Sequence, residues 1–247
     1  WKTSSIFPLT LKYGSNWEAN EITALENSAN NWKVQANGSE VSFFNLTPST
    51  ISELENLDKY DDKELGVYKV LNWPDSLPGS ALAITQLYGT RKNIGASSEY
   101  IEIDHADILV NFDKFHFTTD LTWGYDLETV VLHEMGHFLG LYHDYSSADE
   151  SIMYPTISKY NTGREPKAKD TDLITEKYQL ALAARGLASL KTNSLTGTKD
   201  NIKDNSLSKS EPITLILELY SNGKERIKIK TLKGERYEDF HFNHSHQ

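Results

Sequence analysis

The motif H-E-x-x-H-x-x-G-x-x-H-D at residues 133–144 constrains this chain more than any other stretch. Side chains four residues apart lie on one face of an α-helix, so His133 and His137 can bind the same metal ion. Gly140 can adopt the positive φ that ends a helix, and the turn lets His143 supply a third ligand. Three neutral imidazoles with one position left for water are typical of a catalytic zinc site, because four protein ligands close a structural site.

Glu134 follows the first histidine and lies about 100° further around the helix, so its carboxylate can stand beside the metal without binding it. A carboxylate within reach of a metal-held water is placed to act as a general base. A bare H-E-x-x-H occurs by chance on amphipathic helices, but the glycine and the third histidine at these offsets make an accidental match unlikely. The motif therefore predicts metal-assisted hydrolysis with Glu134 as the base.

A second motif, S-I-M-Y-P, occupies residues 151–155. The long zinc motif followed by this methionine turn resembles the metzincin zinc metallopeptidases, and the turn is most similar to their matrixin branch, in particular to its minimal bacterial members. The resemblance implies that Met153 lies in a tight turn beneath the zinc as an apolar floor. Asp144 departs from the serine that is usual in matrixins and is typical of adamalysin-type metzincins instead.

The same resemblance implies an α+β metzincin catalytic domain. It would have a twisted mixed sheet with two long helices above it, a zinc helix ending at Gly140, and a small C-terminal subdomain with the methionine turn and a last helix. We expect this domain at residues 1–190, with its two subdomains meeting near residue 140. A polar linker would follow at 191–211, and a C-terminal β extension at 212–247.

The C-terminal extension alternates apolar and polar residues from Ile213 to Leu219, and the turn sequence S-N-G-K at 221–224 predicts a β-hairpin. A lone hairpin is marginal in water. It must therefore pack on the catalytic domain, pair with another chain, or belong to something longer.

Periodicity predicts the remaining elements. The N-terminal half reads as a strand at Ile6–Tyr13, a capping box at 15–18, a helix that ends at 37–38 and a strand at Val41–Leu46. Further strands are expected at 67–72, 81–88, 99–103 and 106–112, and a last helix from Asp172 to about Leu190.

Two segments are candidates for binding substrate. Phe115-His116-Phe117-Thr118 would form an exposed edge strand above the cleft, which an extended peptide can join through main-chain hydrogen bonds; an ordinary covered strand is the alternative. The resemblance implies that Pro155-Thr156-Ile157 walls the pocket for the substrate residue after the cut. Thr129, one helical turn before His133, would line the same pocket and favour an apolar residue.

One catalytic Zn²⁺ is the expected cofactor. His105, Asp107 and His116 suggest the second, structural zinc of vertebrate matrixins, but His105 precedes the central strand, so a solvated loop with surface histidines is favoured. Calcium is possible but not indicated, because the carboxylates of residues 104, 107, 113 and 120 have no diagnostic spacing.

Composition narrows the class of protein. The absence of cysteine excludes thiol catalysis, disulfides and cysteine-bound metal. A net charge of −10 argues against a nucleic-acid partner, and no apolar run reaches membrane-spanning length. We expect a bacterial protein that is secreted, periplasmic or on the cell surface, with a leader outside this chain and a protein or peptide substrate. Oligomeric state stays open.

Two other functions compete with a zinc endopeptidase. The chain could be a binding or adhesion protein that uses its C-terminal extension on a metzincin scaffold, but a protein without catalysis has no need of Glu134. It could also be a zinc exopeptidase or amidase, which would require a cleft closed at one end.

Overall fold

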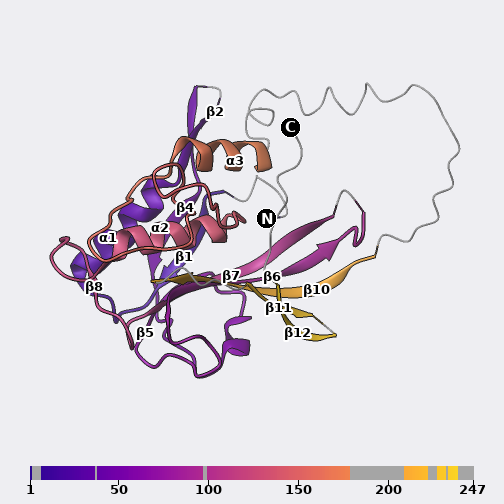
Figure 1. The fold of residues 1–247 in the computed structure, drawn as a ribbon, viewed down its shortest axis with the longest axis horizontal. Helices are drawn as coiled ribbons and strands as arrows, with labels where there is room; N and C mark the ends of the chain where they lie inside the picture. The colour runs from indigo at the N-terminus through magenta and orange to yellow at the C-terminus, as the bar shows by residue number, and fades with distance from the viewer. Residues whose placement is uncertain are drawn as a thin grey trace, which may run out of the picture.

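An eight-stranded mixed sheet forms the centre of the computed structural model, which describes residues 1, 7–36, 38–96, 99–178, 209–221, 227–231 and 233–238. The strand order is β12 (Gly234–Glu238), β11 (Ile227–Thr231), β10 (Glu211–Tyr220), β6 (Ala81–Lys92), β7 (Tyr100–Asn111), β5 (Gly66–Val70), β1 (Leu9–Tyr13) and β4 (Phe44–Pro48). The helices α1 (Ala19–Asn31), α2 (Leu127–Phe138) and α3 (Ala168–Tyr178) lie on one side of this sheet (Figure 1). The predicted α+β fold, with two long helices above a mixed sheet, is confirmed.

Strand direction changes at β6. The strands β4, β1, β5 and β7 pair in parallel, and α1 lies on the crossover between β1 and β4. β6 runs antiparallel to β7, and β10, β11 and β12 continue as antiparallel neighbours. The expected strands at 99–103 and 106–112 form one strand, β7, whose register with β6 shifts at Tyr88/Gly89.

The start of α1 is capped by other residues than those expected. Glu18, the last residue of the predicted box at 15–18, is itself the N-cap, and its backbone N–H donates to Glu21 Oε2 at 2.8 Å. The box is therefore formed by Glu18 and Glu21, one turn later than predicted.

The end of α1 also differs from the prediction. The helix stops at Asn31 and not at residues 37–38. Trp32 and Ala36 are both buried, but a spacing of four residues fits alternate positions of a strand as well as one face of a helix. In the structure the chain after Trp32 forms a strand and not a helix. β2 (Lys33–Ala36) pairs with β3 (Ser39–Ser42) in a separate two-stranded sheet.

The expectation that residues 115–118 form the edge strand above the cleft is wrong. Within this segment, β8 (Phe117–Thr118) pairs with β9 (Tyr125–Asp126) in a small parallel sheet, and Phe117 is buried. The antiparallel strand next to β7 is β6. The sequence of residues 115–118 could not reveal which strand lies at this position, because pairing between distant segments decides which strand borders a sheet.

The C-terminal β extension continues the central sheet and so packs on the rest of the described chain, which is one of the three arrangements expected for it. β10 pairs with β6 and forms an antiparallel hairpin with β11. The last helix, α3, begins at Ala168, four residues before the predicted start, and is described to Tyr178. The rest of that predicted helix, the linker up to residue 208 and the hairpin turn at 222–226 lie outside the described residues.

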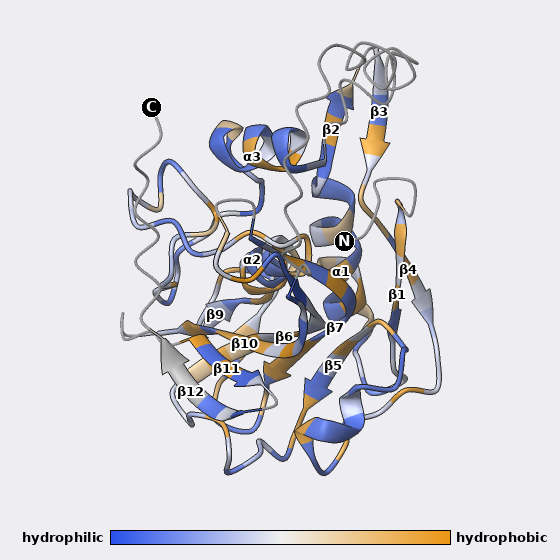
Figure 2. Ribbon diagram, turned by 90° about the vertical axis from the view of Figure 1, so that its right-hand side faces the viewer, coloured by the Kyte–Doolittle hydropathy of each residue, from blue (hydrophilic) through white to orange (hydrophobic). Residues whose placement is uncertain are grey.

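Apolar side chains fill both faces of the sheet. The larger cluster lies between the sheet and the helices α1 and α2, and a second lies on the opposite face beneath the 3₁₀ turn Leu57–Tyr60. α3 buries Asp170, Ile174 and Tyr178 along one side. Hydrophobic and hydrophilic residues alternate along this helix in Figure 2, as is usual for a helix with one buried face. No helix in the described part of the chain is long and apolar enough to span a bilayer.

Candidate metal centre and active site

The helix α2 is buried along its whole length, which fixes the side chains that it carries. On the α1 side, Trp32 Nε1 donates to Leu132 O at 2.8 Å and Ser28 Oγ donates to Glu128 O at 2.9 Å. These bonds run from side chains to the main chain of α2. They set the position of the helix axis as well as its packing.

Asp126 caps the start of α2, as helix-capping preferences would favour. Its Oδ2 accepts from the Thr129 backbone N–H at 3.1 Å and from Thr129 Oγ1 at 2.6 Å. Arg164 donates two hydrogen bonds to the same carboxylate, from Nη2 at 2.6 Å and from Nε at 3.0 Å. The segment after the methionine turn is thereby joined to the N-terminus of the zinc helix.

The chain turns back after α2 in the predicted way. Gly140 has a φ of +84°, a left-handed conformation that costs other residues free energy. The Leu141 backbone N–H then donates to Gly136 O at 2.9 Å, which closes the turn. The turn brings His143 back over the helix that ended at Phe138.

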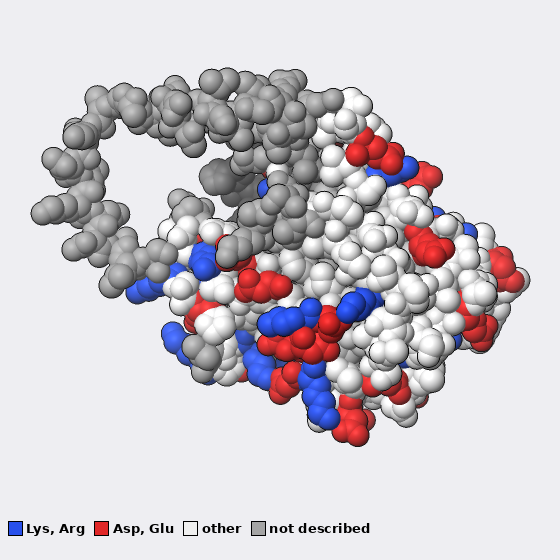
Figure 3. Space-filling view, turned by 180° about the vertical axis from the view of Figure 1, so that it is seen from behind, with Lys and Arg blue, Asp and Glu red and all other residues white. Residues whose placement is uncertain are grey.

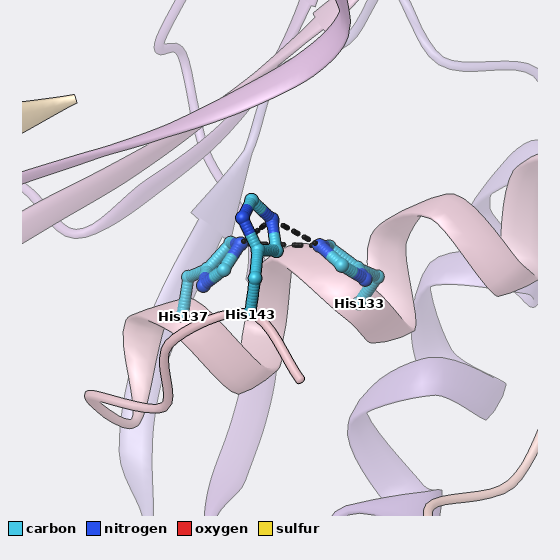
Figure 4. Close-up of side chains that lie close together, drawn as sticks. All are labelled: His133, His137 and His143. Carbon is cyan, nitrogen blue, oxygen red and sulfur yellow. Dashed lines mark hydrogen bonds between the residues drawn. The ribbon is translucent and has the colours of Figure 1, made fainter. Parts of the chain in front are cut away.

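Three imidazoles converge on one point (Figure 4). The Nε2 atoms of His133 and His137 are 3.1 Å apart, and His143 Nε2 lies 3.0 Å from that of His137 and 3.2 Å from that of His133. Nitrogens about 3 Å apart suit one ion at the usual Zn–N length of about 2.0–2.1 Å. Among the described residues, these three alone place ligand atoms of His, Asp or Glu close enough to share an ion.

Carbonyl oxygens orient two of the rings. His133 Nδ1 donates to Ile152 O and His137 Nδ1 donates to Leu141 O, each at 2.8 Å. With the proton held on Nδ1, each ring presents the Nε2 lone pair to the metal. Burial lowers the pKa of His133 to about 3 and holds the pKa of His137 well below its usual value, so both rings stay neutral.

The low pKa of His133 predicts a pH effect on stability. In the unfolded chain His133 has a pKa near 6.5, whereas in the folded, metal-free chain its pKa is about 3. Between these pH values the unfolded chain therefore binds one more proton at His133 than the folded chain does. The contribution of His133 is therefore complete above pH 6.5 and is lost as the pH falls from there, with a slope of roughly 1 kcal/mol per pH unit. Urea unfolding of the zinc-free protein from pH 7 to pH 4 measures it.

A control is needed because Glu134 also affects stability. Burial raises the pKa of Glu134 to about 8, so the stability that this carboxyl contributes falls as the pH rises, opposite to the contribution of His133. The matched control is His133→Gln. The difference in unfolding free energy between wild type and His133→Gln cancels Glu134 and leaves the histidine. A difference that does not change between pH 6.5 and pH 4 contradicts the prediction.

Glu134 lies beside the histidines and is fully buried. Thr85 Oγ1 on β6 lies 2.5 Å from Glu134 Oε2 and 3.0 Å from Glu134 O, and the first contact fixes the carboxyl orientation. Oε1 is buried and has no hydrogen-bond partner among the described residues. Burying a carboxylate oxygen without a hydrogen bond costs free energy unless a ligand binds it. Oε1 is therefore suited to bind a water or a substrate. Burial raises the pKa of Glu134 to about 8.

Met153 packs directly against α2. A Cβ added at Gly136, between His133 and His137, would collide with Met153 Sδ and lie 3.0 Å from both Met153 Cε and Trp32 Cζ2. Asp170 on α3 holds the turn by accepting from Ser151 Oγ at 2.5 Å and from the Ile152 backbone N–H at 2.9 Å.

Gly136→Ala is therefore expected to destabilise the protein. Alanine gains about 1 kcal/mol over glycine in a helix interior, but overpacking a filled core costs about 1–3 kcal/mol, and contacts on two sides favour the larger value. We expect a net loss in urea unfolding. Shortening the methionine in the Gly136→Ala/Met153→Ala double variant should give less than the sum of the two single losses. Strict additivity would show that the two positions do not collide.

Of the predicted pocket residues, Thr129, Pro155 and Ile157 are buried. Thr129 Oγ1 accepts from the Gly163 backbone N–H at 2.9 Å, and a Cβ on Gly163 would touch both Ile152 and Thr129. Ile157 is buried in the same apolar cluster as α2. Phe115 and Phe117 instead pack on Tyr125, and His116 stacks on Trp123 with ring centroids 5.1 Å apart.

The residues of the possible second zinc site are separated. His105 and Asp107 lie buried on β7, with His105 Nε2 2.9 Å from Asp107 Oδ2 and 2.6 Å from Tyr60 O. His116 directly precedes β8, and its ring lies against that of Trp123. His105 is thus a core residue and not the surface histidine that was favoured for it.

Comparison with known proteins agrees with this geometry. The family model described as matrixin, of the class Peptidase_M10, matches residues 28–179. The chain belongs to the matrixin family. Metalloendoproteinase 1-MMP of Arabidopsis thaliana is 37% identical to this matrixin over 84 residues, 34% of this chain and 21% of that protein. Metalloendoproteinase 4-MMP of the same plant is 36% identical over 89 residues, 36% of this chain and 20% of that protein.

This matrixin therefore spans about a fifth of the length of these relatives. Matrixins are zinc-dependent, and the three histidines of this one form the matching metal centre. The strands β10 to β12 lie beyond the residues that the family model matches.

Three residues that support the site were not found from the sequence. Thr85 contacts the glutamate, Asp170 holds the methionine turn and Arg164 grips the helix cap. Each lies 19 or more residues from its partner, and Thr, Asp and Arg are common on surfaces. Nothing in their local sequence marks them.

Proposed function

We propose that this matrixin is a zinc-dependent endopeptidase. The observation that carries the proposal is the convergence of three Nε2 atoms within 3.2 Å, with the carboxyl of Glu134 fixed beside them. A bound zinc would polarise the peptide carbonyl and bring the pKa of a water towards neutrality.

Glu134 acts as the general base and then as the general acid. Its Oε2 is bonded to Thr85, so Oε1 is the oxygen available to take the proton from the attacking water. The same oxygen returns that proton to the leaving amine when the peptide bond breaks. Glu134 is fully buried, and the low dielectric around it strengthens its polar interactions.

The pocket for the residue after the cut is the region bounded by Pro155-Thr156-Ile157 and Thr129. Ile157 and Thr129 are both buried, and no charged side chain belongs to this wall. We therefore expect an apolar residue at that substrate position. The segment Phe115-His116-Phe117 contributes indirectly, by shaping the loop that leads into α2.

Two rival functions are weaker. A binding protein on the same scaffold would not need the oriented Glu134. Binding of nucleic acid is not supported either, because acidic and basic side chains are interspersed on the face in Figure 3, which leaves no broad basic surface there. An exopeptidase remains the nearer rival. Because a peptidase of this kind acts on other proteins, we also propose export from the cell that makes it.

Zinc stoichiometry paired with cleavage-site profiling tests the proposal. The zinc-loaded chain, at high concentration and long incubation, is mixed with an unstructured protein and the fragments are sequenced by mass spectrometry. Cuts at interior bonds, with apolar residues after the cut, are expected. Stepwise loss from one terminus would favour an exopeptidase, and no cleavage by a chain with one bound zinc would refute both.

A further inference from the structure

The strand β10 covers the edge that faces the zinc helix. It pairs antiparallel with β6 from Glu211 opposite Arg91 to Tyr220 opposite Ala81. Without β10, the strand β6 would present a row of free backbone N–H and C=O groups beside α2. An extended peptide binds such an edge by adding a strand. The surface suited to a peptide substrate is thus filled by the chain itself.

The same strand also contacts the wall of the proposed pocket. Tyr220 forms a parallel bridge with Thr156, and the Ile157 backbone N–H donates to Tyr220 O at 3.4 Å. The end of β10 is therefore bonded to β6 on one side of the site and to the segment 155–157 on the other. An extended substrate lying across the metal centre would make main-chain bonds to these two surfaces.

The side chains of β10 place it over the catalytic glutamate. Leu217 lies opposite Thr85, which contacts Glu134. Leu217 and Leu219 are both fully buried and belong to the apolar cluster that includes α2. Alternate residues of a strand share a face, so these two leucines point towards the helix that carries the metal ligands.

We propose that residues 211–220 occupy the position of an extended substrate, so β10 must leave β6 before a protein substrate can bind. This inference rests on the proposed peptidase function and deepens it. Substrates would then carry apolar side chains two residues apart, in the places of Leu217 and Leu219. β10 lies beyond the residues matched by the family model.

Binding of a synthetic peptide with the sequence of residues 211–221 tests the proposal. It is measured by fluorescence polarisation on zinc-loaded full-length chains that carry Glu134→Ala, so that no cleavage intervenes. The chain with native β10 should bind at least about tenfold more weakly than one with Leu217→Gly and Leu219→Gly, because a tethered strand competes at an effective concentration of about millimolar. Glycine removes the apolar contacts without placing a charge beside the metal.

The matched control is the same peptide with both leucines replaced by glycine, which should bind neither chain. Equal affinity of the two chains for the native peptide, including no binding to either, overturns the proposal. Cooperative thermal unfolding and one bound zinc establish that the double-glycine chain is folded. If it is not, Leu219→Ala alone replaces it, with the same order of affinities expected.

Activity separates this proposal from the function on which it rests. With Glu134 intact, the double-glycine chain should cleave an unstructured protein at least about tenfold faster than the native chain, and added 211–221 peptide should slow it. If neither chain cleaves but the difference in peptide affinity remains, the peptidase function fails and the occupancy of β6 stands. If both chains cleave equally fast, the occupancy proposal fails alone.

Discussion

Glu134→Ala is expected to lower peptide hydrolysis by about 10²–10⁴-fold, the usual contribution of a positioned general base, while zinc stays bound. The metal is held by His133, His137 and His143, and the glutamate side chain bonds only to Thr85 among the described residues. Removing it therefore takes away the proton acceptor without removing a ligand. The loss should appear in kcat and in kcat/KM alike, because the proton moves only in the reaction itself.

The measurement needs two controls. Glu134→Gln keeps the size of the side chain and should be as inactive as the alanine variant, because an amide cannot take up the proton. Thr85→Val leaves the carboxylate but removes the hydrogen bond that orients it, and a smaller loss is expected. All variants are compared in the native chain and in the chain with Leu217→Gly and Leu219→Gly. Substantial turnover by Glu134→Ala with one bound zinc would refute the assigned role.

The metal centre could be predicted because its geometry is local. His133 and His137 are one helical turn apart, and Gly140 makes the turn that returns His143, so eleven consecutive residues determine where three ligands lie. The role of Met153 beneath the zinc was implied by resemblance alone and stays a prediction, while the structure shows that Met153 packs against Gly136. Only a residue without a side chain at 136 leaves room for it against α2.

The surroundings of the centre could not be predicted, because they depend on pairing between distant segments. The sequence does not show that residues 81–92 form the strand next to the zinc helix, or that residues 211–220 pair with it. The sequence predicts a strand at 81–88 and another from Ile213 to Leu219, and neither pattern identifies the strand's partner. The segment 115–118 directly follows the strand predicted at 106–112 and lies closer to the zinc motif, so the sequence favours it, wrongly, as the edge.

The cap of the zinc helix is expected to contribute most among single polar side chains to stability. Asp126 is 1% exposed and accepts bonds from the Thr129 N–H, from the Thr129 hydroxyl and from two nitrogens of Arg164. Asp126→Ala removes a helix cap and leaves a half-buried guanidinium without this partner. Together these cost about 2–4 kcal/mol, discounted because Arg164 reaches solvent. Urea unfolding of the zinc-loaded protein measures the loss.

A double-mutant cycle with Arg164→Met separates the two contributions. Arg164→Met keeps the cap, because Asp126 still accepts from Thr129, and it removes the ion pair together with the contacts of Arg164 to Thr119 O and Glu128. If the cap dominates, Arg164→Met costs much less than Asp126→Ala, and the double variant is no worse than Asp126→Ala alone. If the ion pair dominates, the two single variants lose similar amounts. A loss below about 0.5 kcal/mol for Asp126→Ala, the range of ordinary surface substitutions, would contradict both. Because Asp126 and Arg164 join the N-terminus of α2 to the segment after the methionine turn, destabilisation here should also weaken zinc binding.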